Sequence, residues 1–419
     1  MIHVLLVVLA MATFIGHFAL AVWLFNRLHA KPWSRRLIGG LEKALLLTAA
    51  VVLAAYSWRY ISSPVLVWEY PLTAIAWPWQ AYAWFCRALC VLAIPLWLWP
   101  KLTFRTPAAL VEQSNRCIDI AGQLGYRPVA PGRAAVAARI PGNEIFRLQV
   151  ARKTLALPAL PAELEGLMIA HLSDLHMTGK LTREFYEAVV DQTNALQPDL
   201  IAITGDIAET EACIAWVEPI LGRLRARLGS YFVLGNHEQR LADVAPLREA
   251  LRRAGIVDLG SRCQTLDVGG NRILLAGTEM PWFGRRPDVT GFVTHGEAPD
   301  FRLLLSHTPD EYAWGRAQGF DLMLAGHNHG GQIRLPYLGA LITPSRFGCR
   351  YAGGLYLEEP TVLHVSRGIA GLHSVRFNCP PELPLLTLTR SASVDESLED
   401  GAAQSASATR SGRPETSGR

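Results

Sequence analysis

Apolar residues follow two different patterns along this chain. In the N-terminal part they form nearly continuous stretches at 2–25, 37–61 and 72–99. Each stretch is long enough for a helix to cross a bilayer, whose hydrocarbon core takes about 20 residues. Further along, the apolar runs shrink to short segments that end at turn signals. The pattern therefore predicts a helical transmembrane region over 1–102, with the three stretches as spans, followed by a domain of another kind.

Five of the short apolar runs predict buried β-strands. They are continuous instead of alternating with polar residues, which suits sheets that are covered on both faces. Helix-like stretches at 182–196, 211–228 and 246–253 follow the first three runs, with the length of the crossover in a βαβ unit. We therefore expect an α/β domain whose functional side chains lie at the carboxyl ends of strands. The five runs are residues 167–170, 200–203, 231–234, 303–305 and 322–325.

A short polar motif follows each of these predicted strands. By itself each motif has an ordinary explanation, since Gly-Asp is common turn chemistry and a single histidine can be a hydrogen-bonded core residue. Five motifs in one order, each after a strand, instead favour one shared site. The motifs are Asp174-Leu175-His176, Gly205-Asp206, Gly235-Asn236-His237-Glu238, Ser306-His307 and Gly326-His327-Asn328-His329.

The motifs supply seven candidate metal ligands. Carboxylate, imidazole and amide groups suit Mn, Fe, Zn or Ni better than a metal that prefers thiolates. One ion cannot use seven ligands, and a pair of cations about 3.5–4 Å apart needs a bridging group such as the Asp206 carboxylate. Asn236 adds an oxygen without adding negative charge, so the site stays electropositive enough to receive a phosphate ester. The candidates are Asp174, His176, Asp206, Asn236, His307, His327 and His329.

This order of motifs resembles that of the calcineurin-like metallophosphoesterases, whose pattern is D-x-H, G-D, G-N-H-[DE], a later His and G-H-x-H. Residues 326–332 extend the last motif to G-H-x-H-G-G-Q, which is similar to membrane-associated bacterial members. Asn328 stands where Thr is usual, at a position that is not a ligand in the family. The resemblance covers roughly residues 146–388. It implies an αββα sandwich that binds two divalent metal ions and hydrolyses phosphoric esters.

The resemblance also implies a role for each candidate. His237 would be the catalytic side chain that faces the scissile phosphate and protonates the leaving oxygen, with Glu238 helping to orient its ring. Manganese is the first expectation for the metal, and iron, zinc and nickel are alternatives. The implied ligands are Asp174, His176, Asp206 and His329 for the first metal, and Asp206, Asn236, His307 and His327 for the second.

Attachment to a bilayer favours a lipid-linked substrate. Some members of the resembled family cleave the pyrophosphate of UDP-2,3-diacylglucosamine, and we expect metal-hydroxide attack on a phosphodiester or pyrophosphate bond of this kind. A general phosphodiesterase acting on soluble substrates is one alternative. A catalytically inactive membrane scaffold or receptor is another. The loop 280–286 pairs apolar residues with arginines, which suits an interfacial loop as well as one that simply packs.

Basic residues predict the side of the membrane on which the domain lies. Five of them crowd the junction between the first two spans, whereas the next junction holds Arg59 alone. By the positive-inside rule the first junction is cytoplasmic. With three spans the domain then faces the cytoplasm, as in a bacterial inner-membrane protein; if 72–99 only lies in the interface, the domain is on the outer face. The five residues are Arg27, Lys31, Arg35, Arg36 and Lys43.

The remaining segments carry less chemistry. We interpret 103–145 as a connector with a short helix near 108–121, 146–390 as the metallophosphoesterase domain, and the Ser- and Ala-rich segment 391–419 as a disordered tail. The seven cysteines show neither disulfide nor C-x-x-C spacing. A net charge of +4 with dispersed basic residues indicates contact with membrane lipid and no nucleic-acid partner.

Overall fold

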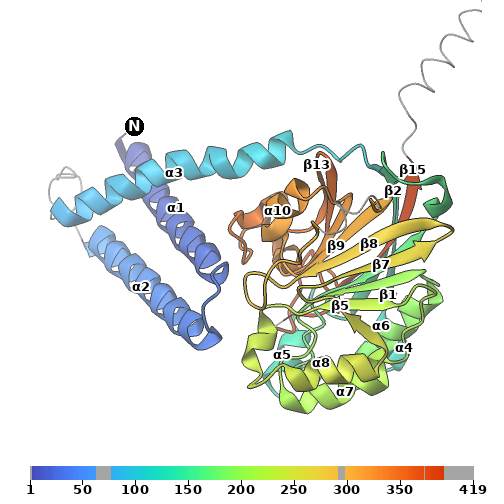
Figure 1. Cartoon of the computed structure of the whole chain (residues 1–419). Coiled ribbons are helices and arrows are strands. Elements are labelled where there is room, and N and C mark those ends of the chain that lie inside the picture. The colour runs from blue at the N-terminus through green and yellow to red at the C-terminus, as the bar shows by residue number, and fades with distance from the viewer. Residues whose placement is uncertain (1, 63–76, 291–297, 372, 391–419) are drawn as a thin grey trace, which may run out of the picture.

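The protein consists of an α/β body and a group of three long helices on one side of it (Figure 1). The computed structural model describes residues 2–62, 77–290, 298–371 and 373–390. The predicted tail 391–419 and the first residues of the third predicted span, 72–76, lie outside the described residues. The long helices are α1 (Ile2–His29), α2 (Arg35–Ser62) and α3 (Trp77–Thr103).

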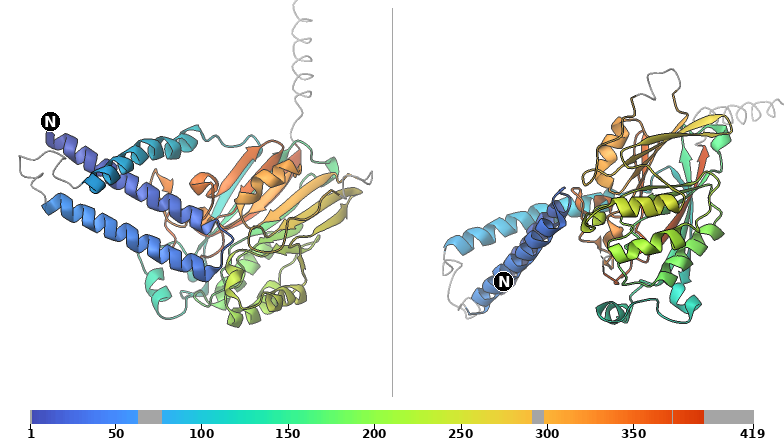
Figure 2. Two further views of the ribbon diagram at one scale, coloured as in Figure 1. Left: turned by 60° about the vertical axis from the view of Figure 1, so that its left-hand side comes forward. Right: turned by 60° about the horizontal axis from the view of Figure 1, so that its bottom comes forward.

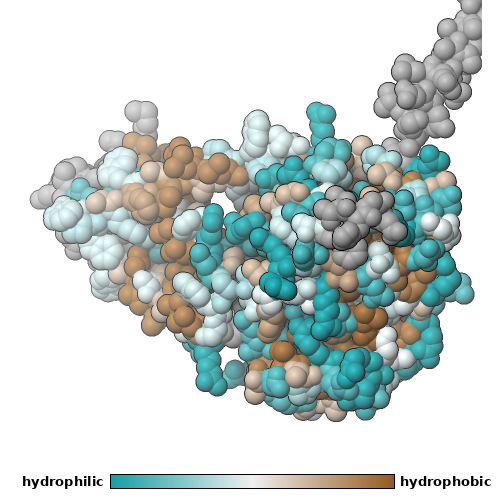
Figure 3. All heavy atoms as spheres, viewed as in Figure 1, coloured by the Kyte–Doolittle hydropathy of each residue, from teal (hydrophilic) through white to brown (hydrophobic). Residues whose placement is uncertain are grey.

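All three helices are long and apolar enough to cross a membrane. Only 22%, 6% and 22% of the residues in their candidate spans are buried inside the protein. Hydrophobic residues accordingly gather on the surface of this helix group (Figure 3). A soluble surface rarely exposes so much apolar area, whereas a bilayer matches it. The chain is therefore a membrane protein with three candidate spans.

Polar side chains join the three helices to one another. Arg87 of α3 is only 7% exposed, and its Nε donates a hydrogen bond to Oγ1 of Thr13 on α1 (3.1 Å). His17 of α1 bonds the hydroxyl of Tyr82 on α3 and lies 3.0 Å from the carbonyl oxygen of Ala49 on α2. Because a charge at membrane depth needs partners, Arg87 obtains one from the neighbouring helix instead of from solvent.

The body contains two mixed sheets. In the first, β3 to β6 run parallel, and in the second, β14, β10, β9 and β8 do. The strand order of the seven-stranded sheet is β1 (Leu110–Asp119), β2 (Arg147–Leu157), β15 (Glu382–Arg390), β3 (Met168–Leu172), β4 (Leu200–Thr204), β5 (Ser230–Val233) and β6 (Ile256–Asp258). The order of the six-stranded sheet is β13 (Gly354–Glu358), β14 (Thr361–Val365), β10 (Leu322–Ala325), β9 (Phe301–Ser306), β8 (Asn271–Thr278) and β7 (Cys263–Val268).

Helices cover the outer faces of both sheets, so the predicted αββα sandwich is confirmed (Figures 1 and 2). Ile169 of β3 packs with Leu303 and Leu322 of the second sheet in a core between the two sheets. The first sheet is covered by α6 (Arg183–Ala195), α7 (Glu211–Leu221) and α8 (Ala245–Arg253), and the second by α10 (Tyr312–Ala317). Two short helices, α4 (Ile120–Leu124) and α5 (Arg133–Ala138), follow β1.

The apolar runs form the central strands, as the sequence predicts. They become β3, β4, β5, β9 and β10, and nearly all their side chains are buried because both faces of each sheet are covered. The helix predicted over 211–228 is shorter than expected, since α7 ends at Leu221 and Gly222 follows.

The short helix predicted near 108–121 is wrong, because this segment forms strand β1. It pairs antiparallel with β2 at the edge of the seven-stranded sheet. Most side chains of β1 are exposed and polar, so this segment lacks the run of apolar residues that predicts a buried strand. Backbone hydrogen bonds to β2 decide the conformation, and the sheet therefore begins within the segment interpreted as a connector.

Candidate metal centre

The candidate ligands all lie on loops that follow the carboxyl ends of strands. Five of them are non-glycine residues with a left-handed backbone, with φ between 46° and 72°. Such conformations are uncommon and cost free energy, and they tend to persist at functional sites. The strained residues are Asp174, His176, Asp206, His327 and His329.

The first group of candidate ligands meets at a single point. Oxygen or nitrogen atoms of Asp174, His176, Asp206 and His329 all lie within 4.8 Å of one another. Nε2 of His329 is 3.4 Å from Oδ1 of Asp174 and 3.1 Å from Nε2 of His176. Three of the four residues are buried, and His329 is partly exposed. The four side chains therefore surround a common position that can hold one ion.

The second group lies on the other side of Asp206. Nε2 of His307 is 3.4 Å from Oδ2 of Asp206 and 3.0 Å from Oδ1 of Asn236. Nδ1 of His327 lies 3.2 Å from the same His307 nitrogen. Asp206 thus contacts both groups, and the structure brings together all seven residues that the sequence singled out.

The donor set fits divalent metal ions. Oδ2 of Asp206 is buried and receives no hydrogen bond from any described residue. Imidazole nitrogens of His307, His176 and His237 nevertheless lie 3.4, 3.6 and 4.0 Å from it. The His307 and His176 distances suit ligands of two neighbouring ions that share Asp206, because a metal ion binds its ligands at about 2.0–2.2 Å. A buried oxygen without a donor is costly, and a cation would satisfy it. The cluster is consistent with a dinuclear site.

Neighbouring groups fix the orientation of the candidate ligands. Nδ1 of His307 donates to the carbonyl oxygen of Thr204 (2.7 Å), which leaves Nε2 directed at the centre. Nδ1 of His176 bonds the carboxylate of Glu209. Such second contacts set the tautomer and position of a metal-binding imidazole.

Glu209, which the sequence analysis missed, holds the ring of His237. Its Oε2 lies 3.1 Å from Nδ1 of His237 and 2.6 Å from Nη1 of Arg240. Its only sequence signal is an acid shortly after the Gly-Asp motif, and such a signal is too common to identify a contact. His176, Glu209 and His237 also form a second group of potential ligand atoms within 4.8 Å.

The expectation that Glu238 orients His237 is therefore wrong. The Glu238 carboxylate is buried and accepts hydrogen bonds from the backbone N–H groups of Gly235 (2.6 Å) and Asp206 (3.2 Å). It ties the loop after β5 to the loop after β4. Burial, reinforced by the charge of Asp206, raises the pKa of Glu238 to about 7.

Burial and charge act in opposite directions within the cluster. Burial raises the pKa of Asp174. Burial also acts to raise the pKa of Asp206, but the imidazoles of His307 and His237 outweigh it and hold that pKa well below its usual range. Burial likewise opposes protonation of His307, yet Asp206 raises its pKa to about 9. Protons and metal ions therefore compete for these side chains.

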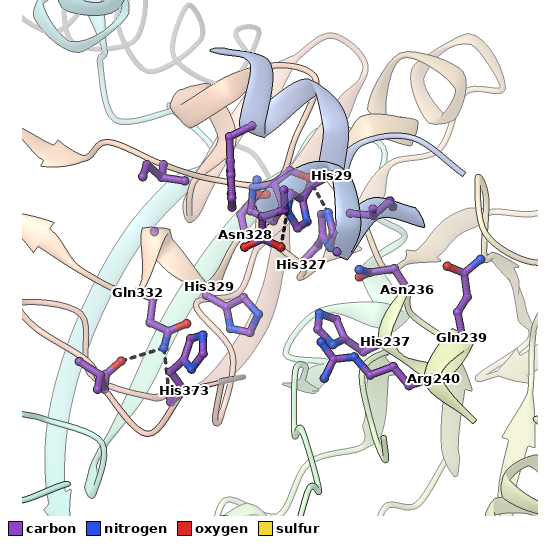
Figure 4. Close-up of a pocket in the computed structure, with 18 of the residues that line it drawn as sticks. His29, Asn236, His237, Gln239, Arg240, His327, Asn328, His329, Gln332 and His373 are labelled. Carbon is purple, nitrogen blue, oxygen red and sulfur yellow. Dashed lines mark hydrogen bonds and ion pairs between the residues drawn. The ribbon is translucent and has the colours of Figure 1, made fainter. Parts of the chain in front are cut away.

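A cavity of about 1360 Å³ reaches the candidate ligands from the side of the long helices. We call it the helix-side cavity. One wall contains Asn236, His237, His327 and His329, which point into it (Figure 4). The opposite wall is made by the ends of α1 and α2. The apolar or basic residues lining that wall include Phe25, His29, Arg36 and Ile38.

The apolar part of the loop 280–286 packs against the body, whereas its last three residues, 284–286, are exposed. Trp282 is 9% exposed, and its ring lies 5.0 Å from that of His327 and 5.6 Å from that of His307. Arg286 is ion-paired with Glu311 (2.7 Å). Trp282 of this loop therefore packs against two ligands of the second group.

A second set of polar side chains is buried between the two sheets, and we call it the inter-sheet network. Nζ of Lys153 lies 2.9 Å from both Glu382 and His364. Nδ1 of His364 is 2.9 Å from Nδ1 of His171, whose Nε2 is 2.8 Å from Oγ1 of Thr204. Arg367 does not face the centre, because it is ion-paired with Glu382 (3.2 Å).

Comparisons with known proteins identify the family. The sequence model for "Calcineurin-like phosphoesterase" matches residues 167–331. The chain is 30% identical to the metallophosphoesterase YkuE of Bacillus subtilis over 58% of its own length and 87% of that protein. It belongs to the calcineurin-like metallophosphoesterases and is a metal-dependent phosphoesterase.

Other relatives differ in their described activities. The phosphodiesterase YaeI of Escherichia coli is 29% identical, over 52% of this chain and 81% of that protein. A bovine transmembrane protein with a metallophosphoesterase domain is 29% identical, over 69% of this chain and 67% of that protein. The UDP-2,3-diacylglucosamine pyrophosphatase LpxG of Chlamydia trachomatis is 27% identical, over 57% of this chain and 88% of that protein.

Proposed function

We propose that the protein is a membrane-anchored dinuclear phosphohydrolase that cleaves a phosphodiester or pyrophosphate bond in a lipid-linked substrate. The observation that carries this proposal is the helix-side cavity. Its walls combine the candidate metal ligands with the ends of two candidate membrane spans. A substrate held there would have its phosphate at the ligands and its apolar part beside the helices.

We assign the ligand roles as the family resemblance implies. Asp174, His176 and His329 would hold one ion, Asn236, His307 and His327 would hold the other, and Asp206 would contribute to both. When bound, the ions supply an activated water nucleophile and neutralise charge on the phosphoryl oxygens. His237 donates a proton to the leaving oxygen from the cavity side. Glu209 keeps the His237 ring in position through its contact at 3.1 Å.

The size and lining of the cavity support an amphiphilic substrate. Cavities for small molecules usually measure about 300–1,000 Å³, and the helix-side cavity exceeds that range. Phe25 and Ile38 offer apolar contact and Arg36 offers a cation for phosphate, while the carboxylate of Glu42 on the same wall lies 3.6 Å from Nε2 of His29. LpxG acts on UDP-2,3-diacylglucosamine, a substrate that has both apolar acyl chains and a pyrophosphate. YaeI, described as a phosphodiesterase, favours soluble or simple diesters as the second candidate.

The helix arrangement supports a cytoplasmic catalytic domain. The C-terminal end of α1 and the start of α2 both border the helix-side cavity, so the basic junction between them lies on the side of the α/β body. By the positive-inside rule this side is the cytoplasm. With α3 as a third span, the chain enters the body from the same side.

The decisive experiment is a substrate panel with the full-length protein in detergent, supplied with Mn²⁺. It includes UDP-2,3-diacylglucosamine, other lipid pyrophosphates, nucleoside diphosphate sugars and bis(p-nitrophenyl) phosphate. Preferential cleavage of the lipid-linked compounds is expected. Cleavage of soluble diesters alone would refute the lipid substrate, and metal-loaded protein without any hydrolysis would favour the scaffold or receptor alternative.

A further inference from the structure

A small hairpin after the last two candidate ligands exposes an unusual number of apolar side chains. Strands β11 (Arg334–Leu335) and β12 (Gly339–Ala340) pair antiparallel, and Tyr337 at the turn is fully exposed. The five other large apolar residues between 333 and 342 are 39–50% exposed. Soluble surfaces seldom gather such patches without a partner. The six residues are Ile333, Leu335, Tyr337, Leu338, Leu341 and Ile342.

The hairpin lies beside the end of α3. Nζ of Lys101 donates a hydrogen bond to the carbonyl oxygen of Leu338. The same ammonium group sits 3.6 Å from the ring centroid of Trp97. With 27 residues, α3 is about 40 Å long, which exceeds a hydrocarbon core of about 30 Å. Trp and Lys at the end of such a helix mark the lipid headgroup region. The hairpin turn is therefore at headgroup level.

The hairpin also has cations near its base that suit anionic lipid. A Cβ atom on Gly339 would lie 3.6 Å from Nζ of Lys101 and 3.8 Å from Nη2 of Arg334, so both charges flank the turn. Basic residues close to an anionic leaflet are attracted to its lipid headgroups. Apolar side chains at the tip and cations at the base are the combination of an interfacial anchor.

The other side of the hairpin faces the candidate metal centre. Four of the six apolar residues line the helix-side cavity, which leaves Tyr337 and Leu338 for the outer face of the turn; the four are Ile333, Leu335, Leu341 and Ile342. Gly331, two residues after His329, approaches the hairpin so closely that a Cβ atom would lie 2.4 Å from that of Ala340. The hairpin is thus packed directly against the loop that carries the ligands.

We propose that the β11–β12 hairpin inserts its apolar turn into the lipid headgroup region beside α3 and forms the lipid-facing wall of the helix-side cavity. The occupant of its exposed face is the phospholipid bilayer. The second part of the inference rests on the proposed function: a lipid-linked substrate reaches the centre along this wall without leaving the membrane surface.

Photo-crosslinking of the full-length protein tests the lipid contact. In nanodiscs of phosphatidylethanolamine and phosphatidylglycerol, Tyr337→p-benzoyl-phenylalanine is expected to give lipid adducts detected by mass spectrometry. The matched control is Thr265→p-benzoyl-phenylalanine, because Thr265 is exposed on β7, a strand of the α/β body away from the long helices (Figure 1). An adduct yield about tenfold above the control is expected for an inserted side chain. Equal yields at the two positions overturn the proposal.

A rate comparison tests the lipid-facing wall. The double substitution Tyr337→Ser and Leu338→Ser removes apolar side chains at the turn. We expect hydrolysis of a nanodisc-embedded lipid pyrophosphate to fall about tenfold, while hydrolysis of bis(p-nitrophenyl) phosphate stays within about twofold. Equal loss on both substrates overturns this part, as does loss on neither. If the unsubstituted protein cleaves no lipid substrate, the proposed function fails, whereas the crosslinking result still decides lipid contact.

Discussion

The metal centre and the inter-sheet network are two buried, histidine-containing clusters that are bonded in different ways. At the centre, oxygen and nitrogen atoms converge, and Oδ2 of Asp206 receives no hydrogen bond from the described residues. In the inter-sheet network each side chain is bonded to the next, from Glu382 through Lys153 to Thr204. Both are surrounded by the same sandwich core, so burial alone does not distinguish them.

The hydrogen-bond directions in the inter-sheet network follow from its chemistry. The Lys153 ammonium only donates, so Nε2 of His364 accepts. Burial lowers the pKa of His364 well below its usual value and that of His171 to about 3, which keeps both rings neutral. His364 must then donate from Nδ1 to His171, and His171 from Nε2 to Thr204. Every ring nitrogen is used, and none remains for a ligand.

Ligand atoms that converge around a buried oxygen without a hydrogen-bond donor therefore identify a binding site better than the number of histidines does. A complete network links the sheets and stabilises the fold. An incomplete network retains atoms that can still bind an ion or substrate. Four predictions test this distinction.

The largest effect is expected for Asp206→Asn, because Asp206 contacts both ligand groups. Turnover of bis(p-nitrophenyl) phosphate should fall about 10³-fold or more, since the ions provide several kcal/mol of stabilisation to the transition state. Metal content per protein, measured by elemental analysis after reloading with Mn²⁺, should fall as well. Asp191→Asn, at an exposed ion pair on α6, is the control and should change neither quantity. Full metal content with near-normal turnover in Asp206→Asn would remove the basis for a shared carboxylate.

His237→Ala should reduce turnover without loss of metal. General acid catalysis contributes about 10²–10⁴-fold, so kcat for a substrate with an alkoxide leaving group should fall by at least about 10². The loss should be smaller for a p-nitrophenolate leaving group, which needs less protonation. Elemental analysis should give unchanged metal content. An equal loss for both leaving groups, or loss of metal, would contradict the assignment of His237 as the proton donor.

Glu382→Gln should affect stability instead of metal binding. It leaves Lys153 and Arg367 buried without a counter-charge, which costs about 3–5 kcal/mol for a broken buried pair. For a domain of this size the melting temperature should drop by roughly 6–20 °C. Glu218→Gln, at an exposed ion pair, is the control and should shift it little. A metal content below that of the unsubstituted protein would show that the two clusters are not separate.

The smallest effect concerns pH. Because the pKa of His171 is about 3 in the folded protein and about 6.5 when unfolded, its neutral burial stabilises the fold fully above pH 6.5. That stability is lost as the pH falls below 6.5, by about 1.4 kcal/mol per pH unit. His171→Gln lacks this contribution, so its melting temperature should decline less between pH 7.5 and 5.0. Parallel declines in the two proteins would contradict a neutral His171.

The sequence anticipated much of the fold where the physical signal is local. Continuous apolar runs predicted β3, β4, β5, β9 and β10, because strands covered on both faces need apolar side chains throughout. The edge strand β1 was missed because its exposed side chains carry no such signal. Its conformation depends on backbone pairing with a partner that lies distant in sequence.

At the candidate metal centre, too, the sequence predicted the local features but not the contacts between distant segments. The motifs located all seven candidate ligands, since ligand chemistry and strand-end placement can be read from the chain itself. The contacts of Glu209 and Glu238 could not be predicted, because the place of an acidic residue near a motif does not fix the direction of its side chain. Glu209 contacts His237, whereas Glu238, next to His237 in sequence, bonds the backbone of Gly235.

By itself the sequence determined the apolar helices, the central strands and the set of side chains with metal-binding chemistry, because each depends on residue type and spacing over short distances. Only the tertiary structure decided that β1 joins the sheet, that His171 and His364 complete an internal network, and that the ends of α1 and α2 face the candidate metal centre. Those outcomes depend on which surfaces meet after the chain folds, and that is set by packing between segments that are far apart in the sequence.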